Sequence, residues 1–371
     1  MKHCAWVVFL LAAMAANAAT KITVDQLKEA LVSMKQAGKS DEDVATRLKT
    51  FELSEELTHS AKNGLLPYLP GDQSNEQILI LQARSAFLAP PASDVPSAPA
   101  PDATAQKAMV DKAFDFVNKT TAQFPLMSAS RMTTRFQDDV TNASSSPGLV
   151  VSGPNTYVRL ANAQVDRIET EHGIEKPGEK DKTPWGQNGL ISDPGPPPPL
   201  GTLLQEASAG KLAFERWQMI GDKQVAVFSF AVDKKKSHYD VSYCCFPKTD
   251  TATGVAAMGT FVPVPGEIQS VTTYRPYKKT AGYHGELFIE PQSGTVDRVI
   301  AIADLKPGDY VHQEAIRMDY TPTVVDGTEY VLPLDHFLAN EVVPGGESSS
   351  SAYSVRHMLF YVAYANYRMS K

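Results

Sequence analysis

Short turn motifs divide the second half of the chain into segments in which polar and apolar residues alternate. Gly221-Asp222, Pro291-Gln292-Ser293-Gly294 and Asp326-Gly327 are each flanked by runs rich in β-branched and aromatic residues. Such short turns join antiparallel strands, since a parallel pair needs a long crossover that is usually a helix. Few helical patterns interrupt these runs. The sequence therefore predicts an antiparallel sheet and excludes a doubly wound α/β fold.

A helical pattern precedes the predicted sheet. Thr23 and Gln26 form a capping box, and apolar residues follow at helical spacing. Similar short amphipathic patterns continue, so we expect a small helical domain over residues 19–88. Residues 89–102 are rich in Pro, Ala and Ser, which favours an extended linker with no core of its own.

We expect the sheet domain to span residues 103–371. Asp102 is placed to cap a helix at the start of this domain, and residues 202–210 show the spacing of a second short helix. Alternation along the strands indicates that one face of the sheet is covered and the other is partly wet or lines a groove. The predicted fold class is α+β: a small N-terminal helical domain, then a curved antiparallel sheet, half-barrel-like, with helices on one face.

The N-terminus has the pattern of a cleavable secretory signal peptide over residues 1–18. Lys2 supplies a positive charge, residues 4–14 are apolar, and small residues lead up to Ala18, where we expect cleavage. A membrane-spanning helix needs about 20 apolar residues, roughly twice this run. Cys4 begins the apolar run instead of following the cleavage position, which excludes a lipoprotein anchor. We expect a periplasmic or secreted protein with no transmembrane segment after cleavage.

Composition limits the partners and the means of stabilisation. The chain of 371 residues has a formal net charge of −7, which gives no general attraction to nucleic acid. After cleavage only Cys244 and Cys245 remain, and adjacent cysteines rarely pair because the ring is strained. We expect no disulfide framework and no cofactor, so that the packed core provides the stability.

The order of helix, long antiparallel meander, second helix and closing strands resembles the half-barrel fold of periplasmic lipoprotein carriers and related envelope-stress regulators. Residues 283–298, with the turn Glu290-Pro291-Gln292-Ser293-Gly294, are similar to a strand-turn-strand of that fold, although Glu290 stands where Asp is more usual. The resemblance covers residues 105–371. It implies a strongly curved sheet with helices on its concave side. The N-terminal helical domain has no counterpart in those carriers.

The mature chain also resembles a group of uncharacterised secreted proteins from Acidobacteria. Residues 38–57, 236–245 and 283–286 carry this similarity. Since that group has no described function, the resemblance implies secretion and no particular activity.

Aromatic residues on the predicted strands indicate a binding groove. Tyr239 and Tyr243 are four residues apart on one strand, so they share a face. A curved sheet could use such residues to line an elongated apolar groove for a lipid, a lipoprotein or an envelope protein. Core packing explains the same residues equally well. The groove candidates are Trp217, Phe228, Phe230, Tyr239, Tyr243 and Phe288.

Two His-x-Glu pairs suggest an alternative, a metal-dependent envelope hydrolase. His284 and Glu286 share one strand face, as do His312 and Glu314, and imidazole with carboxylate can hold a metal ion. Ordinary solvent-facing positions would give the same pattern. The chain lacks a His-Glu-x-x-His helix, a Cys-x-x-Cys pair and a Gly-x-Ser-x-Gly elbow. We therefore prefer a non-enzymatic binding protein, and the hydrolase requires the four side chains to converge.

Overall fold

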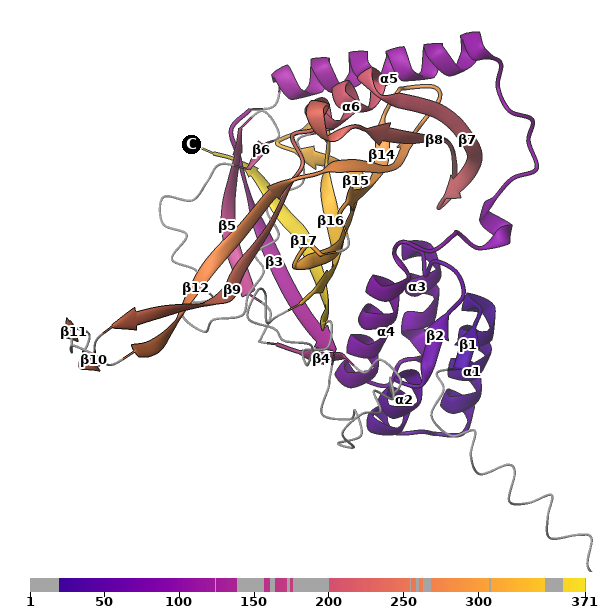
Figure 1. Cartoon of the computed structure of the whole chain (residues 1–371). Coiled ribbons are helices and arrows are strands. Elements are labelled where there is room, and N and C mark those ends of the chain that lie inside the picture. The colour runs from indigo at the N-terminus through magenta and orange to yellow at the C-terminus, as the bar shows by residue number, and fades with distance from the viewer. Residues whose placement is uncertain are drawn as a thin grey trace, which may run out of the picture. The chain divides into compact units, whose positions relative to one another are not determined.

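The computed structural model describes most of the chain as helices and strands (Figure 1). The predicted signal peptide with Ala18 lies outside the described residues, and so do the side chains of Cys244 and Cys245. The chain divides into two compact units, of which the first comprises the described residues of 20–96, Arg135–Asn162 and Met219–Lys223, and the second the remainder. The described residues are 20–123, 125–138, 157–160, 164–171, 174–175, 200–253, 255–257, 260–262, 268–306, 308–343 and 356–370.

The first unit consists mainly of short helices with well-formed N-terminal caps. The hydroxyl of Thr23 accepts from the backbone N–H of Gln26 at 3.2 Å, and the Gln26 side chain accepts from the Thr23 N–H at 3.0 Å, which confirms the predicted capping box. Ser40 and Thr58 cap the next two helices. Its elements are β1 (Thr20–Ile22), α1 (Val24–Gln36), α2 (Asp41–Leu48), β2 (Phe51–Leu53), α3 (His59–Leu65), η1 (Leu66–Tyr68), α4 (Asp72–Ser85), η2 (Ala92–Asp94) and β4 (Tyr157–Arg159).

A parallel pair of strands joins these helices, which the sequence did not predict. β1 and β2 pair from Thr20 opposite Phe51 to Ile22 opposite Leu53. Three residues are too few to show a period of two, and Phe51 also fits the apolar face of the preceding helix. Leu27, Leu31 and Leu57 form the centre of this unit's core and are fully buried.

In the described residues, the second unit holds two α-helices and most of the strands. The Asp102 carboxylate accepts from the Ala105 N–H at 2.8 Å at the start of α5, as the sequence predicted. No helix within the described ranges is both long and apolar enough to cross a membrane. The elements are α5 (Ala103–Gln123), β3 (Met127–Asp138), β5 (Gln164–Glu171), β6 (Ile174–Glu175), α6 (Leu200–Ala209), β7 (Lys211–Ile220), β8 (Lys223–Val232), η5 (Lys234–Lys236), β9 (Asp240–Thr253), β10 (Val255–Ala257), β11 (Thr260–Val262), β12 (Ile268–Thr280), β13 (Gly282–Ile289), β14 (Val296–Asp304), β15 (Val311–Val325), β16 (Thr328–Val342) and β17 (Arg356–Met369).

An antiparallel sheet of 11 strands dominates the fold, in the order β6-β5-β3-β17-β16-β15-β14-β13-β8-β7 with β4 beside β3. Its hairpins lie at the predicted turns. Asp326 and Gly327, with φ of 48° and 83°, form the tight turn between β15 and β16. N-terminal helices followed by a large antiparallel sheet confirm the α+β class. β9 and β12 form a separate two-stranded ribbon beside this sheet (Figure 1).

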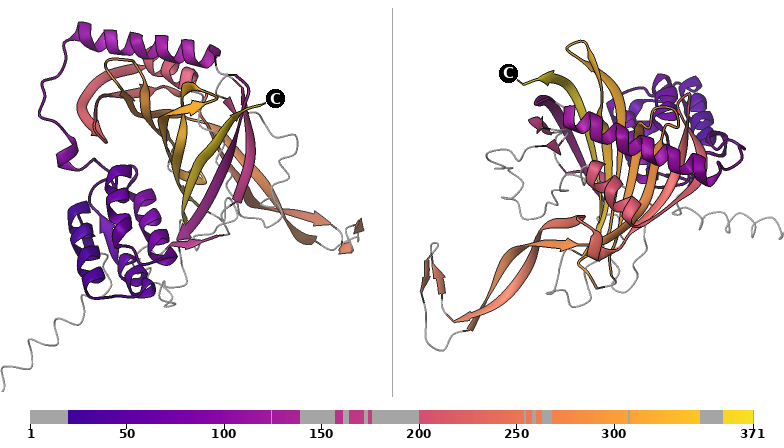
Figure 2. Two further views of the ribbon diagram at one scale, coloured as in Figure 1. Left: turned by 180° about the vertical axis from the view of Figure 1, so that it is seen from behind. Right: turned by 90° about the horizontal axis from the view of Figure 1, so that it is seen from above.

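The strand register separates the side chains of the sheet into two faces. Leu287 lies opposite Phe228 and Val299, and Ile316 lies opposite Leu338. These residues share one hydrophobic cluster with Leu203 and Leu204 of α6 and with Ala113 and Val117 of α5. We call this face the helix side, since α5 and α6 lie over it (Figure 2). The other face, which carries Glu286, Arg298 and Asp319, is the far side.

Candidate functional site

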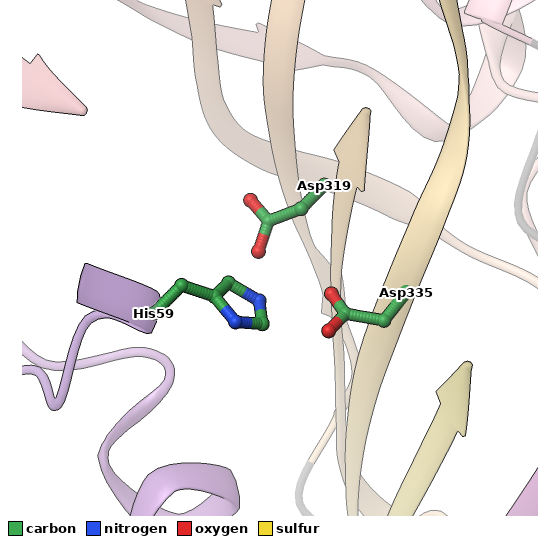
Figure 3. Close-up of side chains that lie close together, drawn as sticks. All are labelled: His59, Asp319 and Asp335. Atoms are coloured by element: carbon green, nitrogen blue, oxygen red, sulfur yellow. The ribbon is translucent and has the colours of Figure 1, made fainter. Parts of the chain in front are cut away.

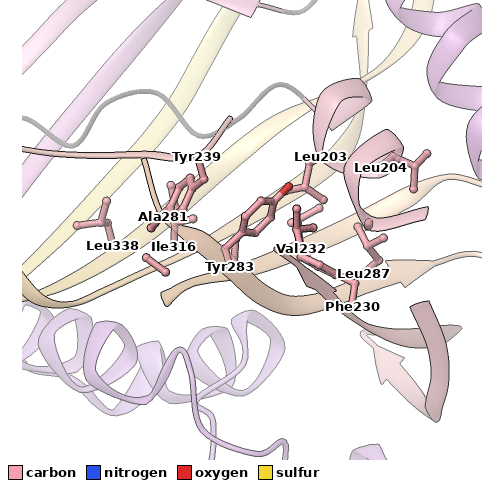
Figure 4. Close-up of a cluster of buried hydrophobic side chains, with 14 of the residues drawn as sticks. Leu203, Leu204, Phe230, Val232, Tyr239, Ala281, Tyr283, Leu287, Ile316 and Leu338 are labelled. Carbon is pink, nitrogen blue, oxygen red and sulfur yellow. The ribbon is translucent and has the colours of Figure 1, made fainter. Parts of the chain in front are cut away.

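A group of polar side chains is buried within the hydrophobic cluster of the helix side. Figure 4 shows two of them, Tyr239 and Tyr283, among the surrounding Leu, Ile, Val and Phe side chains. Ionisable and amide groups rarely lie in such surroundings unless they are paired. We call the following set the polar cluster: Glu206, Tyr239, Tyr283, Glu314 and Asn340.

Glu206 is the fully bonded member of the polar cluster. This α6 residue is 6% exposed, and its carboxylate accepts from the Tyr283 hydroxyl at 2.7 Å and from the His238 backbone N–H at 3.0 Å. Its carboxylate also contacts the ring Nδ1 of His238, whose side chain is largely exposed. Burial, and then the bond to Glu206, raises the pKa of Tyr283. Glu206 therefore ties α6 to β13 and to the segment that leads into β9.

Glu314 has far less compensation. It lies on β15, is 4% exposed, and burial raises its pKa from 4.5 to about 7. Only the Tyr239 phenol opposes this shift, and among the described residues no basic side chain lowers the pKa of Glu314. Burial and then the charge of Glu314 raise the pKa of Tyr239 in turn. The carboxyl group thus lacks a cation and lies beside a phenol.

Asn340 lies directly opposite Glu314 on β16. It is 2% exposed, and neither its Oδ1 nor its Nδ2 makes a hydrogen bond with any described residue. The Tyr239 hydroxyl is also buried without a hydrogen bond of regular geometry, although it lies close to Glu314. Leaving such a group unpaired costs about 1–3 kcal/mol. Buried polar groups in native proteins usually have partners, so this place in the apolar core is the candidate binding site.

Tyrosines surround this position. The rings of Tyr239 and Tyr283 have centroids 5.4 Å apart, and those of Tyr277 and Tyr310 are 6.1 Å apart. Burial, followed by the charge of Asp309, raises the pKa of Tyr277 to about 12. Burial also raises the pKa of Tyr243 to about 12. The phenols therefore remain protonated at neutral pH and act as hydrogen-bonding groups and aromatic walls.

The structure brings together five of the six predicted groove residues. Phe228, Phe230, Tyr239 and Tyr243 are buried in the helix-side cluster, and Trp217 packs against it while its indole N–H donates to the Pro99 carbonyl at 2.9 Å.

Phe288 is the exception among the predicted groove residues. It pairs with Val227, whose neighbour Phe228 faces the helix side, so Phe288 faces the far side. There its ring lies 5.9 Å from the Arg216 guanidinium and 5.3 Å from that of Arg298.

The structure does not bring together the four residues of the predicted metal site. Glu286 accepts from the Arg216 guanidinium at 2.8 Å on the far side, and His284 pairs with Asp304 at 2.7 Å at a half-exposed position. Glu314 lies on the helix side, and His312 is exposed. These residues therefore do not form the metal site that the His-x-Glu pattern suggested.

The far side holds a second buried charged group, the arginine–aspartate cluster. The Asp319 carboxylate accepts from the Arg317 guanidinium at 2.8 Å and from Arg298 at 2.5 Å. Asp335 lies opposite Asp319 on the neighbouring strand and points to the same side (Figure 3). These four residues are between 0% and 4% exposed. Because the buried Asp319 carboxylate pairs with two guanidinium groups, we interpret this cluster as an ion-pair network that stabilises the fold.

Sequence reasoning missed Glu206 and Asn340. Glu206 adjoins Ala207 on the buried face of α6, and Asn340 follows an apolar run in β16. A single polar residue in such a run was the available signal, because Asn is depleted in strands. Their partners come from distant parts of the chain, so no local pattern could assign them a role.

Comparison with known proteins adds no relative. No family model matches this chain, and no curated protein and no solved structure is significantly similar to it.

Proposed function

We propose that this chain is an exported, non-enzymatic protein that binds an amphiphilic ligand between helix α5 and the helix side of the sheet. The observation that supports the proposal is the incomplete packing of α5 against the sheet. Of its side chains that the structure describes, only Ala113 and Val117 are fully buried. Met109, Val110 and Phe114 are only partly buried against the core cluster.

Helix α6 shows what a firmly packed helix looks like on the same sheet. Leu203, Leu204 and Ala207 are between 0% and 2% exposed, although α6 is the shorter helix. Large apolar side chains that are only partly buried on α5 can exchange their present contacts for a ligand's alkyl chain at little cost. We infer that α5 moves when a ligand binds and that α6 stays in place.

One close contact holds α5 against the sheet. Gly294, at the β13–β14 turn, has φ of 79°, and a Cβ atom there would lie 2.5 Å from the backbone carbonyl of Lys112. The Lys112 ammonium donates to the carbonyl of Pro291 at 3.1 Å. The turn between β13 and β14 therefore holds α5 in its present position, and a methyl group at Gly294 would push α5 away.

The resemblance to lipoprotein carriers agrees with this proposal. Those proteins have the half-barrel curvature that we also propose here, and the expected signal peptide would deliver the chain to the compartment in which they work. A lipid, the acyl part of a lipoprotein or an apolar segment of an envelope protein would each present an alkyl group to the layer beneath α5.

Titration with decan-1-ol below its solubility limit tests the proposal. Trp217 contacts the core cluster, so its fluorescence reports on the layer in a chain that lacks residues 1–18, and with them Trp6, and in which Trp185 has been replaced by Phe. We expect a saturable change in Trp217 emission with one site per chain, confirmed by native mass spectrometry. A titration without saturation would show that the layer takes no amphiphile and would overturn the proposal.

A matched pair of glycine substitutions tests the role of α5. Gly294→Ala strains a positive-φ turn and also strikes α5, whereas Gly327→Ala strains a similar turn with φ of 83° and open space around it. We expect Gly294→Ala to bind decan-1-ol at least threefold more tightly and to speed amide exchange in α5. Gly327→Ala should do neither. Equal effects of both substitutions would contradict the proposal that α5 moves when a ligand binds.

Export is tested separately by the intact mass of the protein from the cell envelope. We expect the mass of a chain that begins at Ala19. Retention of residues 1–18 would contradict this part of the proposal.

A further inference from the structure

We propose that Glu314, Asn340 and Tyr239 bind the primary ammonium group of the ligand, so that the amphiphile is an alkylamine or a lipid with a primary amine. This inference rests on the proposed function and goes further, because it names the polar end of the ligand.

The argument begins with hydrogen-bonding capacity. Glu314 and Asn340 are opposite each other on neighbouring strands, with Cβ atoms about 5 Å apart in such a pair. Tyr239, the residue that precedes β9, has its phenol beside the Glu314 carboxyl group. Asn340 Oδ1, the Tyr239 hydroxyl and the Glu314 carboxylate therefore present three acceptors around one point. A primary ammonium carries three N–H donors and no acceptor, so it matches this set.

The charges around this point favour a cation. Glu206 on α6 carries a carboxylate that is 6% exposed, and Asp309 pairs with Lys279 of β12. Against the effect of burial, Arg356 of β17 lowers the pKa of Tyr243, while the pKa of Glu314 shows no influence from Arg356. A buried carboxyl that no cation accompanies is stabilised strongly by one that arrives with a ligand.

Tyrosine rings supply the second attraction. Tyr239 and Tyr283 are in contact, and Tyr277 is close enough to Glu314 for the carboxyl to raise its pKa. Aromatic faces attract an alkylammonium group by cation–π interaction, most strongly where water is excluded.

Other polar groups fit less well. A trimethylammonium group has no N–H donor, so it would leave Asn340 and Tyr239 unpaired. A carboxylate would place a second negative charge beside Glu314. A hydroxyl group has one donor, so it can bond to one acceptor and leaves the other two without a hydrogen bond.

A head-group series on the unaltered mature protein tests the inference. Decylammonium, decyltrimethylammonium, decanoate and decan-1-ol share one alkyl chain and differ at the polar end. At pH 8 and below their micelle concentrations, we expect decylammonium to bind at least tenfold more tightly than each of the other three by isothermal titration calorimetry. Equal affinity for all four, or preference for decanoate, would overturn the inference and leave the proposed function standing. Binding of none would overturn both.

Two glutamate substitutions locate the ammonium site. Glu314→Gln keeps the shape and removes the charge, and we expect it to lose at least tenfold in decylammonium affinity with little change for decan-1-ol. Glu286→Gln makes the same change on the far side, where Glu286 pairs with Arg216, and should bind decylammonium as the unaltered protein does. Unchanged affinity in Glu314→Gln would mean that the cluster holds only water and would refute the assignment.

Discussion

Strand β15 carries buried carboxylates to both faces of the sheet, and the two faces treat them differently. Asp319 on the far side lies between the guanidinium groups of Arg298 and Arg317. Glu314 lies five residues earlier in the chain and on the helix side, and its neighbours there are the Tyr239 phenol and the Asn340 amide. Both side chains are 4% exposed, so burial does not distinguish them.

The difference between the two carboxylates is the basis for our proposal that Glu314, and not Asp319, belongs to a binding site. A buried charge with its counter-charge in place completes the fold, and removing either partner leaves an uncompensated ion. A buried carboxyl without a counter-charge costs stability in the free protein. Proteins carry such costs mainly where a ligand or a reaction uses the group.

The largest expected effect on stability comes from breaking the ion pairs of Asp319 on the far side. Asp319→Asn leaves two buried guanidiniums without their carboxylate and should lower the free energy of unfolding by about 3–5 kcal/mol, measured by urea denaturation. The control is Asp304→Asn, which removes a carboxylate from a half-exposed pair with His284 and should cost less than about 1 kcal/mol. Similar losses in both variants would contradict the distinction between buried and exposed pairs.

The next effect concerns the unpaired side and depends on pH. Because folding raises the pKa of Glu314 from 4.5 to about 7, the folded state holds this proton more tightly. The contribution of Glu314 to stability is therefore fully present below pH 4.5 and is lost as the pH rises to about 7, by roughly 3 kcal/mol at 1.36 kcal/mol per pKa unit.

Glu314→Gln removes this titration. We expect the variant to gain on the unaltered protein by most of that amount between pH 4.5 and pH 8, in parallel urea titrations. A constant stability difference across this range would show that Glu314 titrates normally.

A smaller effect is expected within the polar cluster itself. Tyr283→Phe removes the hydroxyl that donates to the Glu206 carboxylate and should cost about 1.5–3 kcal/mol, as hydrogen bonds to charged groups do. Tyr367→Phe removes a hydroxyl that donates to the Pro333 carbonyl at 2.7 Å, a neutral acceptor, and should cost about 1 kcal/mol. The reverse order of these two losses in thermal unfolding would contradict the greater strength of the Tyr283–Glu206 hydrogen bond.

The smallest effect is expected at the predicted metal residues that the structure leaves at the surface. His284→Ala removes a half-exposed partner of Asp304 and should change stability by less than about 1 kcal/mol. Added zinc should leave the thermal midpoint of both proteins unchanged within about 1 °C, since a ligand stabilises only in proportion to its binding. A rise with zinc that His284→Ala abolishes would restore the metal-site hypothesis.

Prediction from sequence succeeded where the signal is local. The capping box of Thr23 and Gln26 and the Asp326-Gly327 turn depend on residues a few positions apart, and both are present in the structure. Prediction failed for Phe288, which lies on the far side, because alternation tells which residues share a face but not which face the helices cover.

The candidate site shows the same limit more strongly. Glu314 stood out in the sequence as part of a His-x-Glu pair, but its neighbours Tyr239 and Asn340 come from the residue before β9 and from β16. Asn340 gave no motif at all. Pairing between strands sets these neighbours, and a one-residue change of register would move Asn340 to the other face.

The amino-acid sequence by itself determined the α+β class, the hairpin turns and the helix caps, because backbone preferences and the periods of helix and strand act over a few residues. Only the tertiary structure decided that Asp319 pairs with two arginines, whereas no basic side chain of the described residues lowers the pKa of Glu314. That outcome depends on which distant strands pair and in what register. The balance of buried charge in these pairings distinguishes the arginine–aspartate cluster from the proposed binding site.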